Sequence, residues 1–303
     1  MTESLVVSKE DLGERVDKFL TQYFPNHSRT YFQFLIDEES VLLNGHPIKK
    51  QHRLVEGDEV EVSFQTLPML DVKPEAIPLE ILYEDESIIV VNKPSGMVVH
   101  PAPGSYSGTF ANALLHHCKQ LKKEEFENLR PGIVHRLDKD TSGILIAAKN
   151  LAAHQKLVEQ FASRSIEKQY LVICLGVPKE GECSAPIKRH PINRKQMTIN
   201  PEGKEARTHF TVLGRRKGLS LVQAKLITGR THQIRVHLKS MNCPVLGDTT
   251  YGSPSLNQKY NTTRQMLHAR SLKMIHPISE IPLEFIAPIP SDMKNLIDLF
   301  ELA

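Results

Sequence analysis

Hydrophobic residues near the start of the chain recur every three or four positions and then every second position, which predicts helices followed by strands. Within residues 14–24, ERVDKFLTQYF, the apolar side chains share one helix face: Val16, Phe19, Leu20 and Tyr23. A second helix, RTYFQFLIDEE, is expected to have Ser28 as its N-cap. The segments SVLLNGHPI and EGDEVEVSF show a turn signal and an alternating pattern. Residues 1–64 are therefore predicted to form two short helices followed by a small unit of strands.

The rest of the chain mixes helical and strand patterns. Residues 65–78, QTLPMLDVKPEAIP, have three prolines and no periodicity, which predicts a linker. Helices are expected in TFANALLHHCKQL, LAAHQKLVEQFASR, THQIRVHLKSM and SDMKNLIDLFE, the last with Ser291 as its cap. Strands are expected in ESIIVV, GILIAAK, KQYLVICLG, ARTHFTVLG and LSLVQAKLIT. Because there is no regular βαβ alternation, residues 79–303 are predicted to form an α+β domain with a mostly antiparallel, mixed sheet flanked by helices.

Composition narrows the class of protein. A chain of 303 residues suits two domains, and 40% hydrophobic with 24% charged residues is ordinary for a globular protein. No apolar run is long enough for a transmembrane helix, and the start, MTESLVVSKEDLGERVDK, is too polar for a signal peptide. The cysteines stand apart from one another: Cys118, Cys174, Cys183 and Cys243. This spacing indicates neither a zinc site nor a disulfide framework and favours reduced thiols in a cytoplasm.

The charge of the chain is unevenly distributed. The net charge is only +3, yet residues 188–217 hold nine Lys or Arg against two Glu. Such a stretch fits a surface that binds a polyanion, and it equally fits a solvated strand-and-loop surface. Charge alone does not decide between the two.

Candidate chemistry is densest in GIVHRLDKDTSG, residues 132–143. Asp138 follows a short apolar run and precedes the expected strand GILIAA. A carboxylate on a loop supported by a sheet is a frequent catalytic position, although a lone aspartate more often caps a turn. The string also resembles the D-x-D of aspartyl-phosphate phosphatases and the D-T/S-G of aspartic proteases. Both interpretations are weak, because no convincing magnesium-binding acidic pair and no second D-T/S-G string accompany it.

A second candidate segment is ITGRTHQIRVHLKS, residues 227–240, where Thr228 or Thr231 is expected to cap a helix. The polar positions share one face of that helix: His232, Arg235 and Lys239. Ile234 and Leu238 fall on the opposite face. The planar fork of an arginine on a rigid helix suits a buried carboxylate, although an ordinary basic amphipathic helix shows the same pattern.

Two further segments are compatible with a binding cleft. Tyr170 opens the strand KQYLVICLG, and it either packs in the core or faces a cleft, where its ring could stack on a base and its phenol exchange a proton. NKPSGMVVHPAPG, residues 92–104, places Lys93 and His100 in a stiff loop that is suited to form a pocket wall.

Six motifs, in this order, resemble the bacterial RluA-type pseudouridine synthases: NKPSGMVVHP, GIVHRLDKDTSGILIAAK, KQYLVICLG, ITGRTHQIRVHL, PVLGDTTYG and LHA. The resemblance covers roughly residues 80–290. ERVDKFL and SRTYFQFLIDEESVLLNG are similar to the RNA-binding module of ribosomal protein S-four, the alpha-L fold. HPAPGSYSGTFANALLHH and APIKRHPINRKQM resemble the D type of large-subunit synthases, whose members modify a stem-loop of 23S rRNA at the subunit interface. The C type, which modifies other 23S sites, is also similar.

The resemblance implies an isomerase that needs neither cofactor nor metal. The N1–C1′ bond of a uridine breaks, the base turns, and C5 joins C1′, after the nucleotide has been flipped into a pocket. Asp138 is implied as the catalytic carboxylate, acting either as a nucleophile at the sugar or through a glycal intermediate. Burial beneath a base disfavours the charged form of a carboxylate, and pairing with Arg235 is expected to oppose this. Tyr170 is expected to stack on the uracil and take the released proton.

The remaining expectations concern RNA binding. Arg136 is expected to replace the flipped base, and Ile234 and Leu267 to wall the pocket. The other expected substrate or RNA contacts are His135, Lys93 and His100, with Arg189, Arg194, Lys195, Arg29 and Lys18 on phosphates. The implied partner is 23S rRNA in the large ribosomal subunit, bound by a cytoplasmic monomer without a nucleotide cofactor or a membrane. A tRNA substrate and a non-catalytic assembly factor are the alternatives; an intact set of catalytic side chains favours the enzyme.

Overall fold

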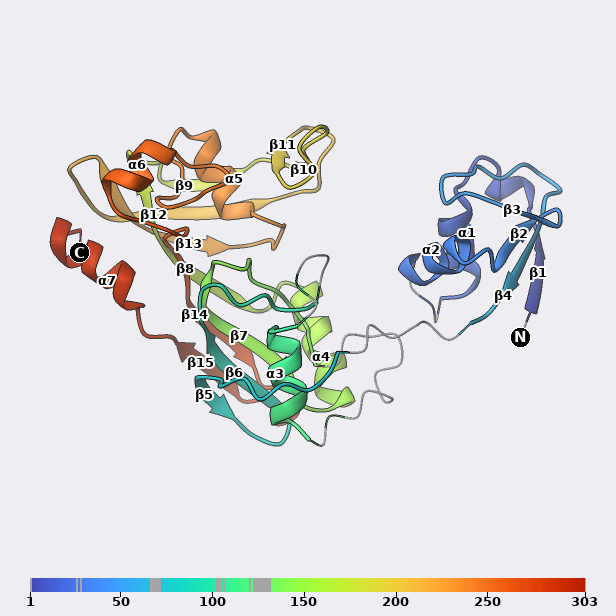
Figure 1. The fold of residues 1–303 in the computed structure, drawn as a ribbon, viewed down its shortest axis with the longest axis horizontal. Helices are drawn as coiled ribbons and strands as arrows, with labels where there is room; N and C mark the ends of the chain where they lie inside the picture. Colours follow the sequence, from blue (N-terminus) through green and yellow to red (C-terminus); the bar gives the residue numbers. More distant parts are fainter. Residues whose placement is uncertain are drawn as a thin grey trace. The chain divides into compact units, whose positions relative to one another are not determined.

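The computed structural model describes residues 2–25, 27, 29–65, 72–101, 105, 107–119, 121 and 132–302. The chain divides into two compact units, the first comprising the described residues up to Gln65 and the second those from Val72 onward. Both units are drawn in Figure 1. The expected linker is described at Gln65 and over 72–78, and its middle lies outside the described residues, as does the expected cap Ser28.

The first unit packs two helices on a four-stranded antiparallel sheet. The helices are α1 (Val16–Tyr23) and α2 (Arg29–Asp37). The strands run in the order β1 (Thr2–Val6), β4 (Glu59–Ser63), β2 (Val41–Leu43) and β3 (His46–Pro47). The apolar face predicted for 14–24 is confirmed at its centre, where Phe19 and Leu20 are fully buried. Strand β1 was not predicted from the sequence, because it is an edge strand whose side chains are half-buried or exposed.

The second unit is built on one large sheet. Its strands run in the order β5 (Ile81–Glu84), β6 (Ile88–Lys93), β7 (Ser142–Ala148), β14 (Leu267–Ile275), β8 (Glu167–Leu175), β13 (Leu219–Leu226), β12 (Arg207–Arg216) and β9 (Gly181–Ser184), with β15 (Pro282–Ile286) also paired to β14. The pair formed by β7 and β14 is parallel, and the other pairs are antiparallel. The predicted α+β class with a mostly antiparallel, mixed sheet is therefore confirmed.

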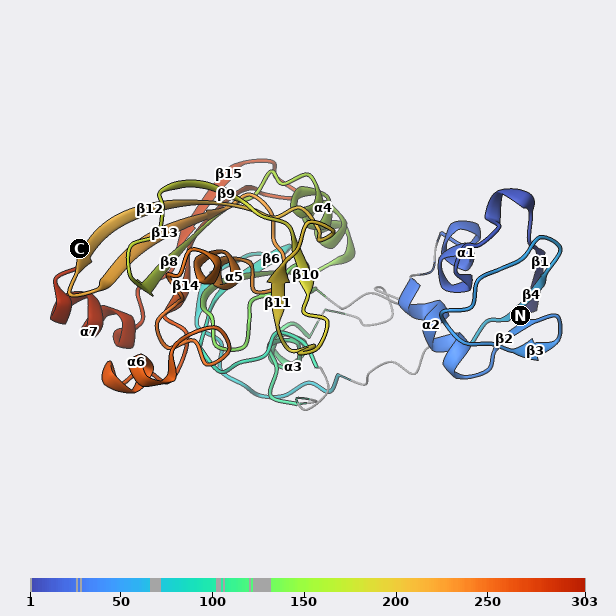
Figure 2. The same ribbon diagram turned by 90° about the horizontal axis from the view of Figure 1, so that it is seen from above.

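Helices and one separate hairpin complete this unit. The helices are α3 (Phe110–His117), α4 (Leu151–Ala162), α5 (Gln233–Ser240), α6 (Pro254–Lys259) and α7 (Ser291–Phe300). Helix α7 begins at Ser291 with Pro290 as its N-cap, so the predicted serine cap is wrong by one residue. Strands β10 (Ile187–Arg189) and β11 (Met197–Ile199), drawn in Figure 2, form a two-stranded hairpin of their own, and neither pairs with a strand of the large sheet.

The centre of the large sheet depends on a close approach of β7 and β14. These strands pair over His268–Ser142 and Ala269–Gly143. Gly143 has φ +109°, and a Cβ at this position would lie 2.3 Å from the carbonyl oxygen of Ala269. Only glycine fits such a contact. The glycine that ends DKDTSG therefore brings Leu267, at the start of β14, beside the segment that carries Asp138.

Candidate active site

Asp138 lies in an extended segment that runs along β7 before turning into it. Ile133 forms a single bridge with Ala147, so the short apolar run before Asp138 pairs with β7 at one residue pair. The Nε2 of His135 accepts the backbone N–H of Ile146 at 3.0 Å. The N–H of Thr141 then donates to the carbonyl of Asp138 at 3.1 Å, closing a turn. These contacts with the backbone of the buried strand β7, together with the turn, thus fix the position of the Asp138 carboxylate.

A buried lysine ties the neighbouring loop to the same turn. Lys93 is 1% exposed, and its ammonium donates to the carbonyl oxygens of Pro94, Met97 and Lys139 at 2.8, 2.9 and 3.0 Å. Burial lowers the pKa of Lys93 to about 7, against the opposing charges of Asp140 and Asp138. The expectation that Lys93 contacts RNA is wrong for this structure, because its donors are already used inside the protein.

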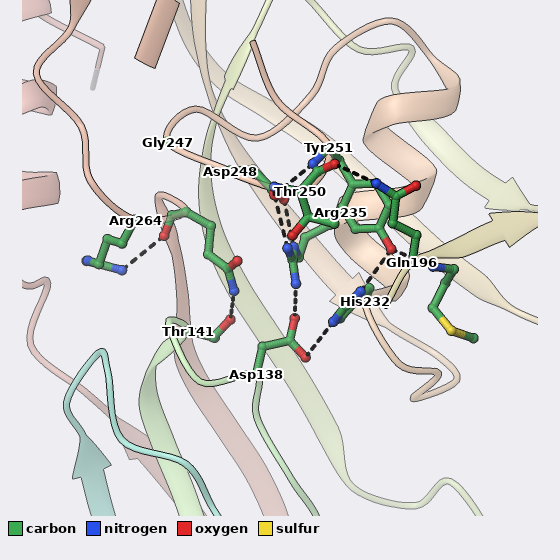
Figure 3. Close-up of polar contacts among 12 residues, drawn as sticks. Asp138, Thr141, Gln196, His232, Arg235, Gly247, Asp248, Thr250, Tyr251 and Arg264 are labelled. Atoms are coloured by element: carbon green, nitrogen blue, oxygen red, sulfur yellow. Dashed lines mark hydrogen bonds and ion pairs between the residues drawn. The ribbon is translucent and has the colours of Figure 1, made fainter. Parts of the chain in front are cut away.

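Arg235 stands between two carboxylates, as Figure 3 shows. Its Nε and Nη2 donate to Oδ2 and Oδ1 of Asp248 at 2.7 and 3.0 Å, and its Nη1 donates to Oδ2 of Asp138 at 2.8 Å. Burial works against the charge of Arg235, but Asp248 and Asp138 outweigh it and raise its pKa. The guanidinium is therefore a permanent cation beside Asp138.

Asp248 is fixed in turn by the backbone that follows it. Its side chain is fully buried, and Oδ1 also accepts the N–H groups of Thr250 and Tyr251 at 2.8 and 3.0 Å. Because one side of the guanidinium is clamped by two hydrogen bonds, Nη1 has little freedom to leave Asp138. Asp248 thus holds the arginine in the orientation that the carboxylate of the loop requires.

Helix α5 presents Arg235 differently from the sequence-based expectation. Neither Thr228 nor Thr231 is the N-cap; that position is His232, whose backbone is left-handed at φ 57° and makes no side-chain cap bond. Thr228 instead donates its hydroxyl to Oε1 of Gln233 at 2.8 Å. Residues 233–238 are all buried, so Arg235 is the partner of buried carboxylates and α5 is not an ordinary basic amphipathic helix at this position. The helix can be buried because the carboxylates of Asp248 and Asp138 form hydrogen bonds with the guanidinium of Arg235.

His232 reaches the second oxygen of Asp138. Its Nε2 lies 3.9 Å from Oδ1 of Asp138, and its Nδ1 lies 2.8 Å from the hydroxyl of Tyr251. That hydroxyl also accepts the N–H of Met197 at 2.7 Å, and the carboxylate beside Nε2 favours the tautomer in which Nε2 carries the proton and Nδ1 accepts from Tyr251. Burial lowers the pKa of His232. The ring is therefore a neutral imidazole with its Nε2–H aimed toward the carboxylate.

Two cavities meet at the Asp138 segment. The first, of about 410 Å³, is walled by side chains from several elements: Tyr170, Ile234, Leu267, Phe161 and Arg230. The second, of about 510 Å³, lies against His100, Thr249, Thr250 and Gln265. Arg136, Asp138, His232 and Arg235 belong to both linings. The carboxylate thus stands at the junction of two spaces, the first of a size that holds a nucleobase.

Tyr170 supplies a flat wall of the first cavity. It lies in β8 opposite Ala224 of β13 and Ala269 of β14, and these small neighbours leave room beside the ring. Burial, and then the charge of Asp138, raise the pKa of Tyr170. The phenol is therefore uncharged at neutral pH, so it can accept a proton only while passing its own proton on.

Some of the other predicted RNA contacts are exposed to solvent, and others are already bonded inside the protein. Arg136 is exposed at the junction of the cavities, and Arg189, Arg194 and Lys195 are exposed on the β10–β11 hairpin. His135 is largely occupied inside the protein, stacked on Phe161 at 4.7 Å with its pKa lowered by burial to about 3. In the first unit Lys18 is exposed and pairs with Glu14, whereas Arg29 is half-buried and pairs with Asp17 at 2.9 Å.

Sequence reasoning missed the roles of three residues of the site. Asp248, Tyr251 and His232 lie within the recognised motifs, but their contacts span gaps in the sequence that no local period reveals. The signal was the string LGDTTYG, whose buried acid and aromatic ring form a compact turn. Within the described residues, no cluster of three or more His, Cys, Asp or Glu is arranged to hold a metal, and no helix is long and apolar enough to cross a membrane.

Comparison with known proteins gives a consistent result. The model of the family described as RNA pseudouridylate synthase matches residues 87–240. The RNA pseudouridine synthase YlyB of Bacillus subtilis (strain 168) is 43% identical over 97% of this chain and 96% of its own length. Ribosomal large subunit pseudouridine synthase D of Escherichia coli (strain K12) is 39% identical over 97% and 92%. The structure of human RNA Pseudouridylate Synthase Domain Containing 4 superimposes with a TM-score of 0.58 at 27% identity, covering 72% of this chain and 92% of that one.

Proposed function

The chain belongs to the RNA pseudouridylate synthase family, and we propose that it isomerises uridines of 23S rRNA in the large ribosomal subunit, with the subunit-interface stem-loop as its target. The similarity to synthase D of Escherichia coli over 97% of the chain supports this substrate. The protein acts in the cytoplasm as a monomer, and its first unit adds affinity for RNA through exposed cations such as Lys18.

The observation that carries the proposal is the asymmetric binding of the Asp138 carboxylate. Oδ2 is held by Arg235 at 2.8 Å, whereas the only polar side-chain partner of Oδ1 among the described residues is the imidazole of His232, at 3.9 Å. The side chain is 18% exposed and lines both cavities. An anion with one fixed and one accessible oxygen is suited to react with a nucleotide placed above it.

The isomerisation requires no net gain or loss of atoms. The N1–C1′ bond breaks, the uracil turns, C5 bonds to C1′, and the proton that C5 loses is balanced by the proton that N1 gains. Oδ1 of Asp138 either attacks C1′ or removes the proton at C2′ to give a glycal. A substrate with deuterium at C2′ distinguishes the routes, because only the glycal route breaks that bond.

The groups around Asp138 take complementary roles. Arg235 keeps the carboxylate anionic when the base excludes water, since a buried carboxylate without a cation would be neutralised. The ring of Tyr170 stacks on the uracil, with Ile234 and Leu267 closing the pocket, and its phenol relays the proton from C5. Arg136, exposed beside the carboxylate, fills the stack that the flipped nucleotide leaves.

The deciding experiment maps pseudouridines in 23S rRNA from cells that lack the protein and from cells complemented with the wild type or with Asp138→Asn. We expect the marks of the interface stem-loop to disappear and to return only with the wild type. Loss of marks at other 23S positions would retain the chemistry and correct the target. A phenotype rescued equally by Asp138→Asn, with no change in any rRNA or tRNA pseudouridine, would instead indicate a non-catalytic assembly factor.

A further inference from the structure

The tip of the β10–β11 hairpin presents an unusual side chain to solvent. Residues 191–195 are all exposed, and Ile192 is 88% exposed, the highest value among the large apolar side chains of the described residues. A single exposed isoleucine needs no explanation on a loose loop. This one stands on a tip whose conformation is held by local hydrogen bonds and whose neighbours are cationic.

Side chains of the hairpin hold its tip in one shape. The Nδ1 of His190 accepts the N–H groups of Ile192 and Asn193 at 3.3 and 3.0 Å. The Oδ1 of Asn193 accepts the N–H of Lys195 at 3.2 Å, and the guanidinium of Arg189 donates to the carbonyl of Arg194 at 3.0 Å. Such local bonds pre-organise a turn, so that little conformational entropy is lost when a ligand binds it.

The border of the tip is cationic. Arg189, Arg194 and Lys195 surround Ile192 in the sequence, and none of the three forms an ion pair with another described residue. Lys188, in contrast, is paired with Glu202 at 2.7 Å. An apolar side chain bordered by unpaired cations matches a single-stranded nucleic acid, in which flat base faces alternate with phosphates.

The root of the hairpin is joined to the active site. The Nε2 of Gln196 donates to the carbonyl of Thr250 at 3.2 Å, and the N–H of Met197 donates to the hydroxyl of Tyr251. Ile187 is buried in one cluster with Val236 of α5 and Tyr251. Thr250 also lines the second cavity. The tip therefore has a fixed offset from Asp138, and a contact there sets the register of the RNA relative to the reacting uridine.

We propose that this tip is a specificity-determining RNA contact, in which Ile192 packs on the face of an unpaired base near the target while the flanking cations bind the adjoining phosphates. The inference rests on the proposed function, since it takes the same RNA as the ligand. The sequence led us to expect only phosphate binding by the cations of this stretch, which weakens as salt rises. The proposal adds an apolar contact by Ile192, whose strength does not depend on salt.

The test uses the full-length protein and a protein-free fragment of 23S rRNA that contains the target stem-loop. The dissociation constant is measured by filter binding across a series of salt concentrations. The expected result for Ile192→Ala is binding about tenfold weaker with an unchanged salt slope, as for loss of one base contact. Lys195→Ala should instead lower the slope by about one. Ile192→Leu should restore most of the affinity.

An exposed isoleucine elsewhere on the second unit provides the matched control. Ile278, 51% exposed in the turn between β14 and β15, is that site, and Ile278→Ala should bind as the wild type does. Equal affinity of Ile192→Ala and the wild type for free RNA would overturn the proposal. If the variant then proved defective only on ribosomal particles, the tip would instead contact a protein partner. Failure of the proposed function is seen separately, as wild-type protein that binds the fragment without forming pseudouridine.

Discussion

Two aspartates in different units are both paired with arginine, yet they have different accessibility. Asp17, in the first unit, is fully buried: Oδ1 accepts from Arg15 at 3.0 Å, and Oδ2 accepts from Arg15, Arg29 and Gln33. Asp138, in the second unit, is 18% exposed and has one oxygen bound and one facing a cavity. An ion pair with arginine is therefore no mark of function by itself.

What distinguishes the two carboxylates is the unsatisfied oxygen. A fully buried carboxylate with both oxygens hydrogen-bonded inside the protein contributes to folding, and a substrate cannot reach it. Arg235 holds Oδ2 of Asp138 in place, and no hydrogen bond from another described residue reaches Oδ1. The comparison also explains why Arg29 is a poor candidate for phosphate binding, since its guanidinium completes the shell of Asp17.

The largest effect that we expect from this difference is a loss of activity without a loss of stability when Asp138 is changed. Asp138→Asn should lower the rate of pseudouridine formation at least about a thousandfold, because the amide is neither a nucleophile nor a base. Its melting temperature should stay near that of the wild type, because the position is partly solvated. The measurement is a single-turnover assay on RNA beside a thermal melt.

The matched variant in the first unit should show the reverse. Asp17→Asn leaves charged donors of Arg15 and Arg29 without their anion and should cost about 2 kcal/mol of stability. Its rate at saturating RNA should be unchanged below the melting transition. A rate loss in Asp17→Asn comparable with that of Asp138→Asn would contradict the distinction drawn between the two carboxylates.

The next effect concerns the clamp behind Arg235. Asp248→Asn keeps the size of the side chain but weakens both hydrogen bonds that orient the guanidinium, so Nη1 no longer has a fixed position. We expect the rate constant of the chemical step to fall about a hundredfold, since small displacements of catalytic groups have effects of this order. Arg235→Lys should behave similarly, because an ammonium cannot bridge two carboxylates as the fork does. RNA affinity serves as the control and should change little.

Much of this arrangement could be predicted from the sequence, and the missing parts share a physical cause. The strands around Tyr170 and the pairing of Asp138 with Arg235 were expected, because apolar alternation is local and the motifs resemble a known family. The pairing is confirmed at 2.8 Å. The roles of these residues in catalysis remain predictions that the variants above address.

The errors arose where long-range contacts override local chemistry. A threonine before a helix is a good cap in isolation, but Thr228 is used by Gln233 and by the N–H of Arg207 instead. A lysine in a polar loop is usually solvated, but Lys93 is enclosed by three carbonyl groups. The role of Asp248 was missed because no acidic residue beside it in the sequence suggests a metal site. Its hydrogen-bond partner, Arg235, lies on helix α5, a different element. None of these contacts produces a repeating pattern of hydrophobic and polar residues in the sequence.

A smaller effect is expected from the hydrogen bond between Tyr251 and His232. Tyr251→Phe removes the proton that the hydroxyl directs to Nδ1, so the imidazole can change tautomer and turn its Nε2–H away from Asp138. The rate of the chemical step should fall about tenfold, with RNA affinity unchanged.

The pH profile of the same variant distinguishes tautomer control from simple packing. In the wild type, burial lowers the pKa of His232, so the rate should be flat on the acid side of neutrality. Losing the donor to Nδ1 destabilises the neutral ring and raises its pKa, which moves the acid limb of the profile to higher pH. Phenylalanine also removes the acceptor for Met197, but a packing defect alone would lower the rate equally at every pH.

The smallest effect returns to Asp17 and its pH dependence. Burial acts to raise the pKa of Asp17, but hydrogen bonds from Gln33, Arg15 and Arg29 outweigh it and hold the pKa below its usual range. The group therefore stabilises the fold at pH values above its unfolded-state pKa of about 4. That contribution is lost as the pH falls through the lower folded-state pKa. Urea denaturation between pH 3 and pH 7 should show a decline in wild-type stability toward acid that is shallower in Asp17→Asn. Parallel curves for the two proteins would mean that the carboxylate of Asp17 is not the group that titrates.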